Sequence, residues 1–193
     1  MTLLSAFVLL FLVMDPAGNL PLFLSALEPV APERRRAVIA RELLIALGVL
    51  VAFLFLGPML LGAVGISESG LAIAGGIILF LISLRMIFPQ PGGFAEEVTG
   101  EPFIVPLAIP FVAGPSAMAA VMLVMSEDPL RWPEWLAALV LAWAASAAIL
   151  LAAPRIRRVL GRRGLIAVER LMGMVLTALA VEMFLRGLRG AGV

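Results

Sequence analysis

Six apolar stretches dominate this chain, and each is long enough to cross a membrane as a helix. A helix needs about 20 apolar residues to span the roughly 30 Å hydrocarbon core of a bilayer. The stretches cover residues 3–27, 43–64, 70–88, 103–125, 133–153 and 165–185. Because little of the 193-residue chain lies outside them, we expect a single all-α, polytopic domain over residues 1–193, with the lipid bilayer as its surroundings.

The composition excludes several other classes of protein. Hydrophobic residues make up 63% of the chain and charged residues only 14%, with a net charge of +1. A soluble domain is about 45–50% apolar and about 25% charged, and a nucleic-acid binder carries a basic face. The chain has no Cys, His, Tyr or Lys. It therefore lacks the usual metal ligands and the commonest general base, and we expect no enzyme activity, no bound metal and no cofactor.

Arginine is distributed unevenly between the two sides of the expected membrane domain. With six spans, the loops that follow the first, third and fifth stretches share a side, and with their flanks they hold eleven arginines against three opposite. Because cytoplasmic loops are enriched in Arg, we expect loops 28–42 and 154–170 and the linker 89–102 to be cytoplasmic. Both termini should then lie outside the cytoplasm, in the plasma or inner membrane of a bacterium or archaeon.

Two similar motifs indicate an internal repeat. Pro-Ala-Gly-Asn-Leu-Pro stands at residues 16–21 and Pro-Phe-Val-Ala-Gly-Pro at residues 110–115, an offset of 94. Each motif interrupts the first span of one half, so the halves are residues 1–88 and 103–193, joined by the linker. Three spans in each half invert the second relative to the first, as in many secondary transporters. The alternative is a coincidence of two proline kinks, which are common in membrane helices.

The motifs predict broken helices at the middle of the membrane. Proline lacks an N–H and clashes with the preceding turn, so we expect the first and fourth helices to break at Pro16, Pro21, Pro110 and Pro115. Unwound backbone is tolerated in a membrane only where it is buried in protein or lines a watery cavity.

Asp15 also lies near mid-membrane, where a carboxylate costs about 2.5–3.5 kcal/mol on insertion scales. Such a cost favours a functional role for this carboxylate. The alternative is that Asp15 caps the following half-helix.

The expected site suits a small zwitterionic solute such as an amino acid. The positive ends of two half-helices, 19–27 and 116–125, would attract a carboxylate, and Asp15 would attract an ammonium group. The residues assigned to substrate binding are Asp15, Gly18, Asn19, Pro21, Ala113, Gly114, Pro115 and Ser116.

Asp15, Arg85 and Glu182 are candidates for coupling or gating. Simpler alternatives are an Arg85 side chain that extends to the headgroups and an interfacial ion pair between Glu182 and Arg186.

In this context the motifs resemble those of the MarC family of bacterial integral membrane proteins. The family's first helix carries a DPxGNxP-like motif, matched here by residues 15–21, and its fourth helix carries PLAxPxxAGPG, matched by residues 106–116. Ser116 stands where the family usually has Gly. The resemblance covers nearly the whole chain. It implies a fold similar to six-helix LysE-type exporters and, from some members, transport of small neutral amino acids such as alanine or glycine.

These observations favour a secondary transporter that works by alternating access around a midplane site. Coupling to H⁺ or to Na⁺ is open, and the chain has no P-loop pattern for ATP. A proteolytic dyad would need a second deep carboxylate, which we do not find. A channel or an accessory structural protein is the alternative. The substrate, the direction of transport and a homo-oligomeric state are left open.

Overall fold

The computed structural model describes residues 1–27, 29–88, 103–104 and 107–192. All regular elements within these ranges are helices. They are α1 (Leu3–Met14), α2 (Leu20–Ala26), α3 (Arg35–Val64), α4 (Glu68–Ile87), the π-helix η1 (Leu107–Val112), α5 (Pro115–Glu127), the 3₁₀-helix η2 (Pro129–Arg131), α6 (Trp132–Leu151) and α7 (Ala153–Gly190).

Four helical segments of the described chain are long and apolar enough to cross a membrane. They cover Arg35–Gly57, Ser69–Ile87, Pro129–Leu151 and Ala153–Gly190. Two further apolar helices, α1 and α5, are shorter. The all-helical, membrane-type architecture expected from the sequence is therefore present.

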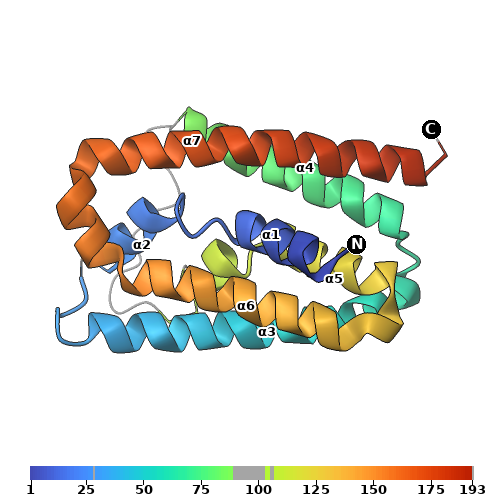
Figure 1. Cartoon of the computed structure of the whole chain (residues 1–193), viewed down its shortest axis with the longest axis horizontal. Coiled ribbons are helices and arrows are strands. Elements are labelled where there is room, and N and C mark those ends of the chain that lie inside the picture. The colour runs from blue at the N-terminus through green and yellow to red at the C-terminus, as the bar shows by residue number, and fades with distance from the viewer. Residues whose placement is uncertain (28, 89–102, 105–106, 193) are drawn as a thin grey trace.

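The helices lie roughly along one long axis in three rows (Figure 1). α3 and α6 pack together along one edge, α4 and α7 pack together along the other, and α1, α2 and α5 lie between them. Both chain termini lie at one end of the bundle, while α3 and α7 begin at the opposite end. The arginine-rich starts of α3 and α7 are therefore far from the termini.

The first apolar stretch forms two helices with non-helical chain between them. α1 is capped at its C-terminal end by Asp15, which has left-handed backbone angles (φ 42°, ψ 59°) and donates its N–H to the carbonyls of Phe11 and Leu12. Pro16 follows directly and has no N–H with which to continue the α1 ladder. Helical structure resumes at Leu20.

The fourth apolar stretch is also irregular, at the residue before Pro110. Ile109 has extended angles (φ −127°, ψ 126°) inside the π-helix, as expected for a residue that precedes a proline. α5 begins at Pro115, a position where a missing N–H costs no helix hydrogen bond.

The arginine-rich segments differ from the loops expected there. Residues 154–170 lie within α7, and α3 already begins at Arg35, inside the expected loop 28–42. Arginine is a good helix former, so charge alone does not end a helix. A sharp turn occurs at Gly161, whose backbone angles are φ 62° and ψ −179°. The linker 89–102 lies outside the described residues.

Small residues bring α4 and α7 into close contact. A Cβ built on Gly76 would lie 2.8 Å from the carbonyl oxygen of Ala180, and one on Gly187 would lie 2.9 Å from that of Ser69. A Cβ on Gly173 would lie 3.0 Å from the carbonyl oxygen of Ser83.

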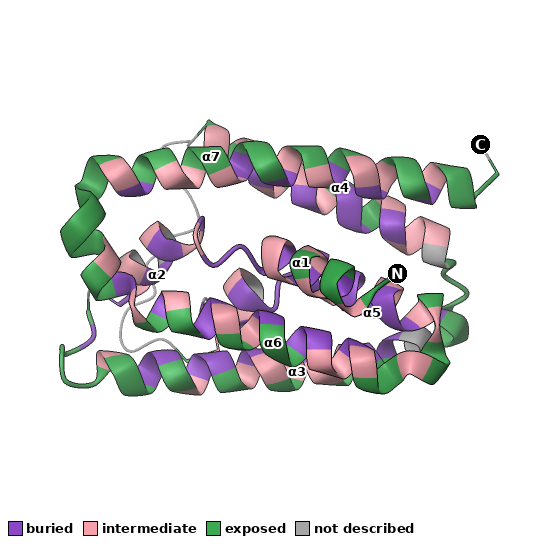
Figure 2. Cartoon of the chain, in the orientation of Figure 1, coloured by how far each residue is buried: buried purple, intermediate pink, exposed green. Residues whose placement is uncertain are grey.

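Buried residues line the inside of the bundle, whereas exposed residues cover much of its outside (Figure 2). Many exposed side chains are large and apolar, which suits contact with lipid.

Candidate functional site

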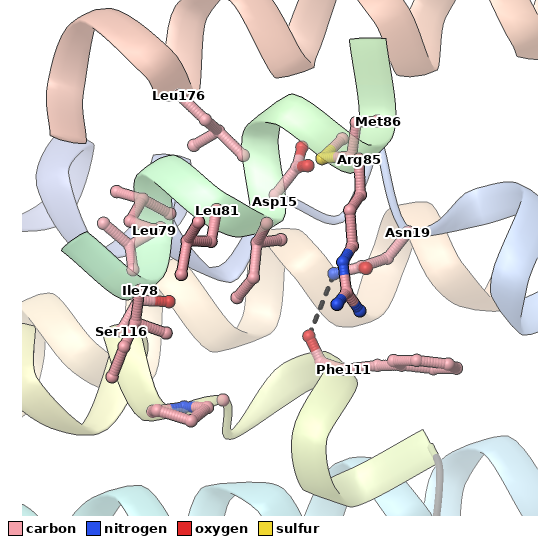
Figure 3. Close-up of a pocket in the computed structure, with 14 residues that line it drawn as sticks. Asp15, Asn19, Ile78, Leu79, Leu81, Arg85, Met86, Phe111, Ser116 and Leu176 are labelled. Carbon is pink, nitrogen blue, oxygen red and sulfur yellow. Dashed lines mark hydrogen bonds between the residues drawn. The ribbon is translucent and has the colours of Figure 1, made fainter. Parts of the chain in front are cut away.

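A cavity of about 300 Å³ lies in the middle of the bundle, between the α1–α2 connection, α4, α5 and α7 (Figure 3). Its walls are mostly apolar, with a few polar groups among them. The residues that line it are Val13, Asp15, Asn19, Ile78, Leu79, Leu81, Ile82, Arg85, Met86, Phe111, Gly114, Pro115, Ser116 and Leu176. A largely apolar cavity with a few convergent polar groups is the usual form of a small-molecule site.

Asp15 forms a buried carboxylate at one wall of this cavity. Its residue exposure is only 4%. Oδ1 accepts a hydrogen bond from the backbone N–H of Gly18 at 3.0 Å, so the side chain satisfies one N–H of the turn that precedes α2. Gly18 has no room for a side chain, because a Cβ there would overlap the Asp15 carboxylate and the Met86 methyl group. The close approach of carboxylate and chain therefore depends on this glycine.

Asn19 joins the two irregular segments of the chain. Its Nδ2 donates to the carbonyl oxygen of Met14 at 3.0 Å. The same nitrogen donates to the carbonyl oxygen of Phe111 at 2.9 Å (Figure 3). Met14 ends α1 and Phe111 lies in η1, 92 residues further along from Asn19. One amide group thus holds both segments at the edge of the cavity.

The start of α5 forms another wall. Gly114 is the N-cap and has no side chain that could bond the first free N–H groups of the helix. Gly114, Pro115 and Ser116 all line the cavity, and Ser116 is 4% exposed. The first N–H groups of a helix carry partial positive charge, so this wall favours a carboxylate or another anion.

α4 contributes a cation to the same cavity. The Arg85 side chain extends beside Asn19 and the Phe111 carbonyl (Figure 3). Together, Asp15, Arg85 and the start of α5 place one negative and two positive groups around one small volume. That arrangement can hold a molecule that carries both charges.

The structure brings together most of the residues assigned from the sequence, but not all of them. Asp15, Asn19, Arg85, Gly114, Pro115 and Ser116 line the cavity, and Gly18 lies against Asp15. Pro16, Pro21 and Ala113 belong to the irregular segments or the helix beside them but are not among the lining residues. Pro110 lies in η1.

Glu182 lies elsewhere in the bundle. It lines a second cavity of about 760 Å³ towards the end that holds the termini. There it forms ion pairs with Arg186 at 3.0 Å and Arg189 at 3.4 Å, which fits the interfacial alternative.

Sequence reasoning missed the apolar wall that α4 provides. Ile78, Leu79, Ile82 and Met86 look like any other residues of an apolar stretch, and no pattern marks the face that meets the cavity.

Glu42 was missed as well, because it lies among the charges of the expected loop 28–42. It is fully buried, pairs with Arg41 at 2.9 Å and has an Oε2 without a hydrogen-bond partner among the described residues. Within the described ranges, no group of three or more acidic, His or Cys side chains could hold a metal ion.

The long apolar helices and the cavity between them define the class of protein as a helical integral membrane protein. The family is then clear: the chain belongs to the MarC family, described as MarC family integral membrane protein, whose pattern matches residues 1–191. The resemblance seen in the sequence motifs is thereby confirmed.

Relatives cover nearly the full length of the chain. UPF0056 inner membrane protein YhgN of Escherichia coli (strain K12) is 48% identical over 189 residues, which cover 97% of this chain and 96% of that protein. A UPF0056 membrane protein of Buchnera aphidicola subsp. Schizaphis graminum is 43% identical over 97% of this chain and 96% of its own length. UPF0056 membrane protein PYRAB13050 of Pyrococcus abyssi (strain GE5 / Orsay) is 34% identical over 94% of this chain and 92% of its own length. No solved structure matches the chain.

Proposed function

We propose that this protein is a secondary transporter of small neutral amino acids, such as alanine or glycine, and not an enzyme. The observation that carries the proposal is the central cavity, in which Asp15, Arg85 and the start of α5 surround one small space. Charged groups inside a membrane domain are costly and usually mark the path of a polar solute or ion.

The arrangement suggests how an amino acid would bind. Its ammonium group would approach the Asp15 carboxylate, and its carboxylate would approach Arg85 and the N–H groups of Ser116 and Ala117. The volume of about 300 Å³ lies at the small end of ligand sites, and apolar side chains such as Ile78 and Leu176 line it. An amino acid with a short apolar side chain fits such walls, whereas a charged side chain would add a third charge to the substrate and leave it without a partner.

Helix packing supports an inverted repeat of three spans plus three, in which α1–α2 and η1–α5 are the broken first spans of each half. α1 packs on α6 while η1 packs on α3, and α2 packs on α7 while α5 packs on α4. In each of these two pairs, exchanging the halves turns one contact into the other.

A hydrogen bond between the two halves also supports the inverted repeat. Thr177 Oγ1 donates to Ser83 Oγ at 2.9 Å, and these residues are 94 positions apart, which is also the offset between the two proline motifs. A twofold axis relating the halves would pass between these two side chains.

In this proposal the halves rock to expose the central cavity to each side of the membrane in turn. The larger cavity near the termini shares α1, α4, α5 and α7 with the central one and would be the route on that side. When the ammonium group is absent, the Asp15 carboxylate would bind the coupling H⁺ or Na⁺ in its place. The protein would lie in the inner membrane with its arginine-rich end in the cytoplasm.

Transport by purified protein in liposomes tests the proposal. Wild-type protein should exchange radiolabelled alanine or glycine in a saturable way, and both Asp15→Asn and Arg85→Gln should lower the exchange at least about tenfold, since each removes one charged partner of the zwitterion. Glu134→Gln is the control, because Glu134 pairs with Arg131 at the protein surface at 2.6 Å.

The outcomes separate function from site. If no amino acid exchanges above the level of empty liposomes, the transporter is rejected in favour of a channel or an accessory protein. If exchange is saturable but insensitive to both site variants, the site is rejected and the function stands.

A further inference from the structure

The first turns of α7 lie across the end of the bundle instead of along it. In Figure 1 the chain leaves α6, crosses that end and then turns into the long part of α7. The turn is at Gly161, whose left-handed φ of 62° is open to glycine at little cost. If the long helices cross the bilayer, residues 153–160 lie close to the plane of its surface.

This segment is strongly basic on its exposed side. Residues 153–163 contain five arginines and no acidic residue. Arg155, Arg158, Arg162 and Arg163 are all exposed, and none of them forms an ion pair with another residue of the described chain.

Apolar side chains are exposed among these arginines. Val159 is 84% exposed and Leu160 is 42% exposed, whereas Ala153 on the inner side is fully buried. An exposed valine between arginines is unfavourable in water but suits the boundary between headgroups and acyl chains. Basic and apolar groups thus meet on one surface at the level of the membrane interface.

We propose that residues 153–163 bind the headgroups of anionic phospholipids. The guanidinium groups would bind lipid phosphates through paired hydrogen bonds, while Val159 and Leu160 would enter the boundary region. Arg34 and Arg36 at the exposed start of α3 lie at the same end of the bundle and extend the basic surface, with Glu33 as the exposed acid beside them. This proposal is independent of transport.

Lipid titration of the purified protein tests it. The full chain in a neutral detergent is titrated with phosphatidylglycerol or phosphatidylcholine, and bound lipid is counted by native mass spectrometry. We expect preference for phosphatidylglycerol, and a loss of about fivefold in affinity for each arginine removed, so that Arg155→Gln with Arg158→Gln weakens binding at least about tenfold.

Matched variants identify the cause of any change. Arg186→Gln with Arg189→Gln removes two exposed arginines from the opposite end and should leave binding unchanged. Arg155→Lys with Arg158→Lys keeps the charge and should retain most of the preference. If the first glutamine variant fails to fold, Arg162→Gln with Arg163→Gln removes two exposed arginines of the same segment and should weaken binding in the same way. The proposal is overturned if the two lipids bind equally, if the opposite-end variant has the same effect, or if inorganic phosphate displaces the lipid at equal concentration.

Discussion

Replacing Asn19 gives the sharpest test of how the two irregular segments are held together. Its Nδ2 donates to the carbonyl oxygens of Met14 and Phe111 at 3.0 and 2.9 Å. Asn19→Ala removes both bonds and leaves both acceptors without this partner. Side-chain hydrogen bonds inside membrane proteins average about 0.6 kcal/mol each and reach about 1.7 kcal/mol. The expected loss of unfolding free energy is therefore about 1–3 kcal/mol.

The substitution Asn19→Asp should be more harmful than Asn19→Ala, although Asp has the same shape. An aspartate lacks both N–H donors and would place a negative charge against two carbonyl oxygens. Thr177→Val serves as a reference, since it removes one bond between helices, the 2.9 Å contact with Ser83.

Thermal unfolding in detergent, followed by the fluorescence of the three tryptophans, measures these effects at one fixed scan rate. Each kcal/mol corresponds to about 2–4 °C for a chain of this size. We expect Asn19→Ala to lower the midpoint by about 3–10 °C, Thr177→Val by less, and Asn19→Asp by the most. An Asn19→Asp protein as stable as the wild type would refute the donor role of the amide.

Three further predictions follow from packing, charge and access. Gly76→Ala should lower the free energy of unfolding by about 1–3 kcal/mol, measured by denaturant or heat, because the new Cβ would meet the backbone of α7. Gly62→Ala should be neutral or stabilising, since no described atom lies within 4 Å of a Cβ at that position. Equal effects of the two substitutions would contradict the close packing of α4 and α7. Glu42→Met should match or exceed wild-type thermal stability. It removes a buried carboxylate whose Oε2 has no hydrogen-bond partner among the described residues, and its ion-pair partner Arg41 is 36% exposed, so water can solvate the arginine that is left. A fall of more than about 2 kcal/mol would show that the charge is needed. The chain has no cysteine, so a single introduced thiol reports on its own position. Ser69→Cys, in the larger cavity, should react with a membrane-impermeant thiol reagent applied to the outside of intact cells, whereas Met174→Cys, on the lipid-facing side of α7, should not. The reverse pattern would exclude that cavity as the outer route.

The sequence predicts the polar part of the central cavity well, because charged and amide side chains are costly inside a membrane and because paired prolines around a glycine mark where a helix breaks. Asp15, Asn19 and Ser116 stand out for this reason, and all three line the cavity.

The apolar wall could not be predicted in the same way. A helix of a membrane protein is apolar on its lipid face and on its inner face alike, so no periodicity shows which side of α4 carries Ile78 and Met86. The helical start of α7 was missed because a run of arginines near a membrane surface is compatible with either a loop or a helix.

The small residues between α4 and α7 recur with one spacing on both helices. On α4 the spacing is seven residues between Ser69, Gly76 and Ser83. The residues that contact them on α7 are Gly187, Ala180 and Gly173, in that order, and they are also seven residues apart. A seven-residue spacing keeps one face of a helix against its neighbour over several turns. Backbones locked together at three levels cannot slide or rotate past each other without losing all three contacts at once. Because α4 belongs to the first half and α7 to the second, this fixed contact should be the place about which the halves rock, with the larger movements in the helices farther from it.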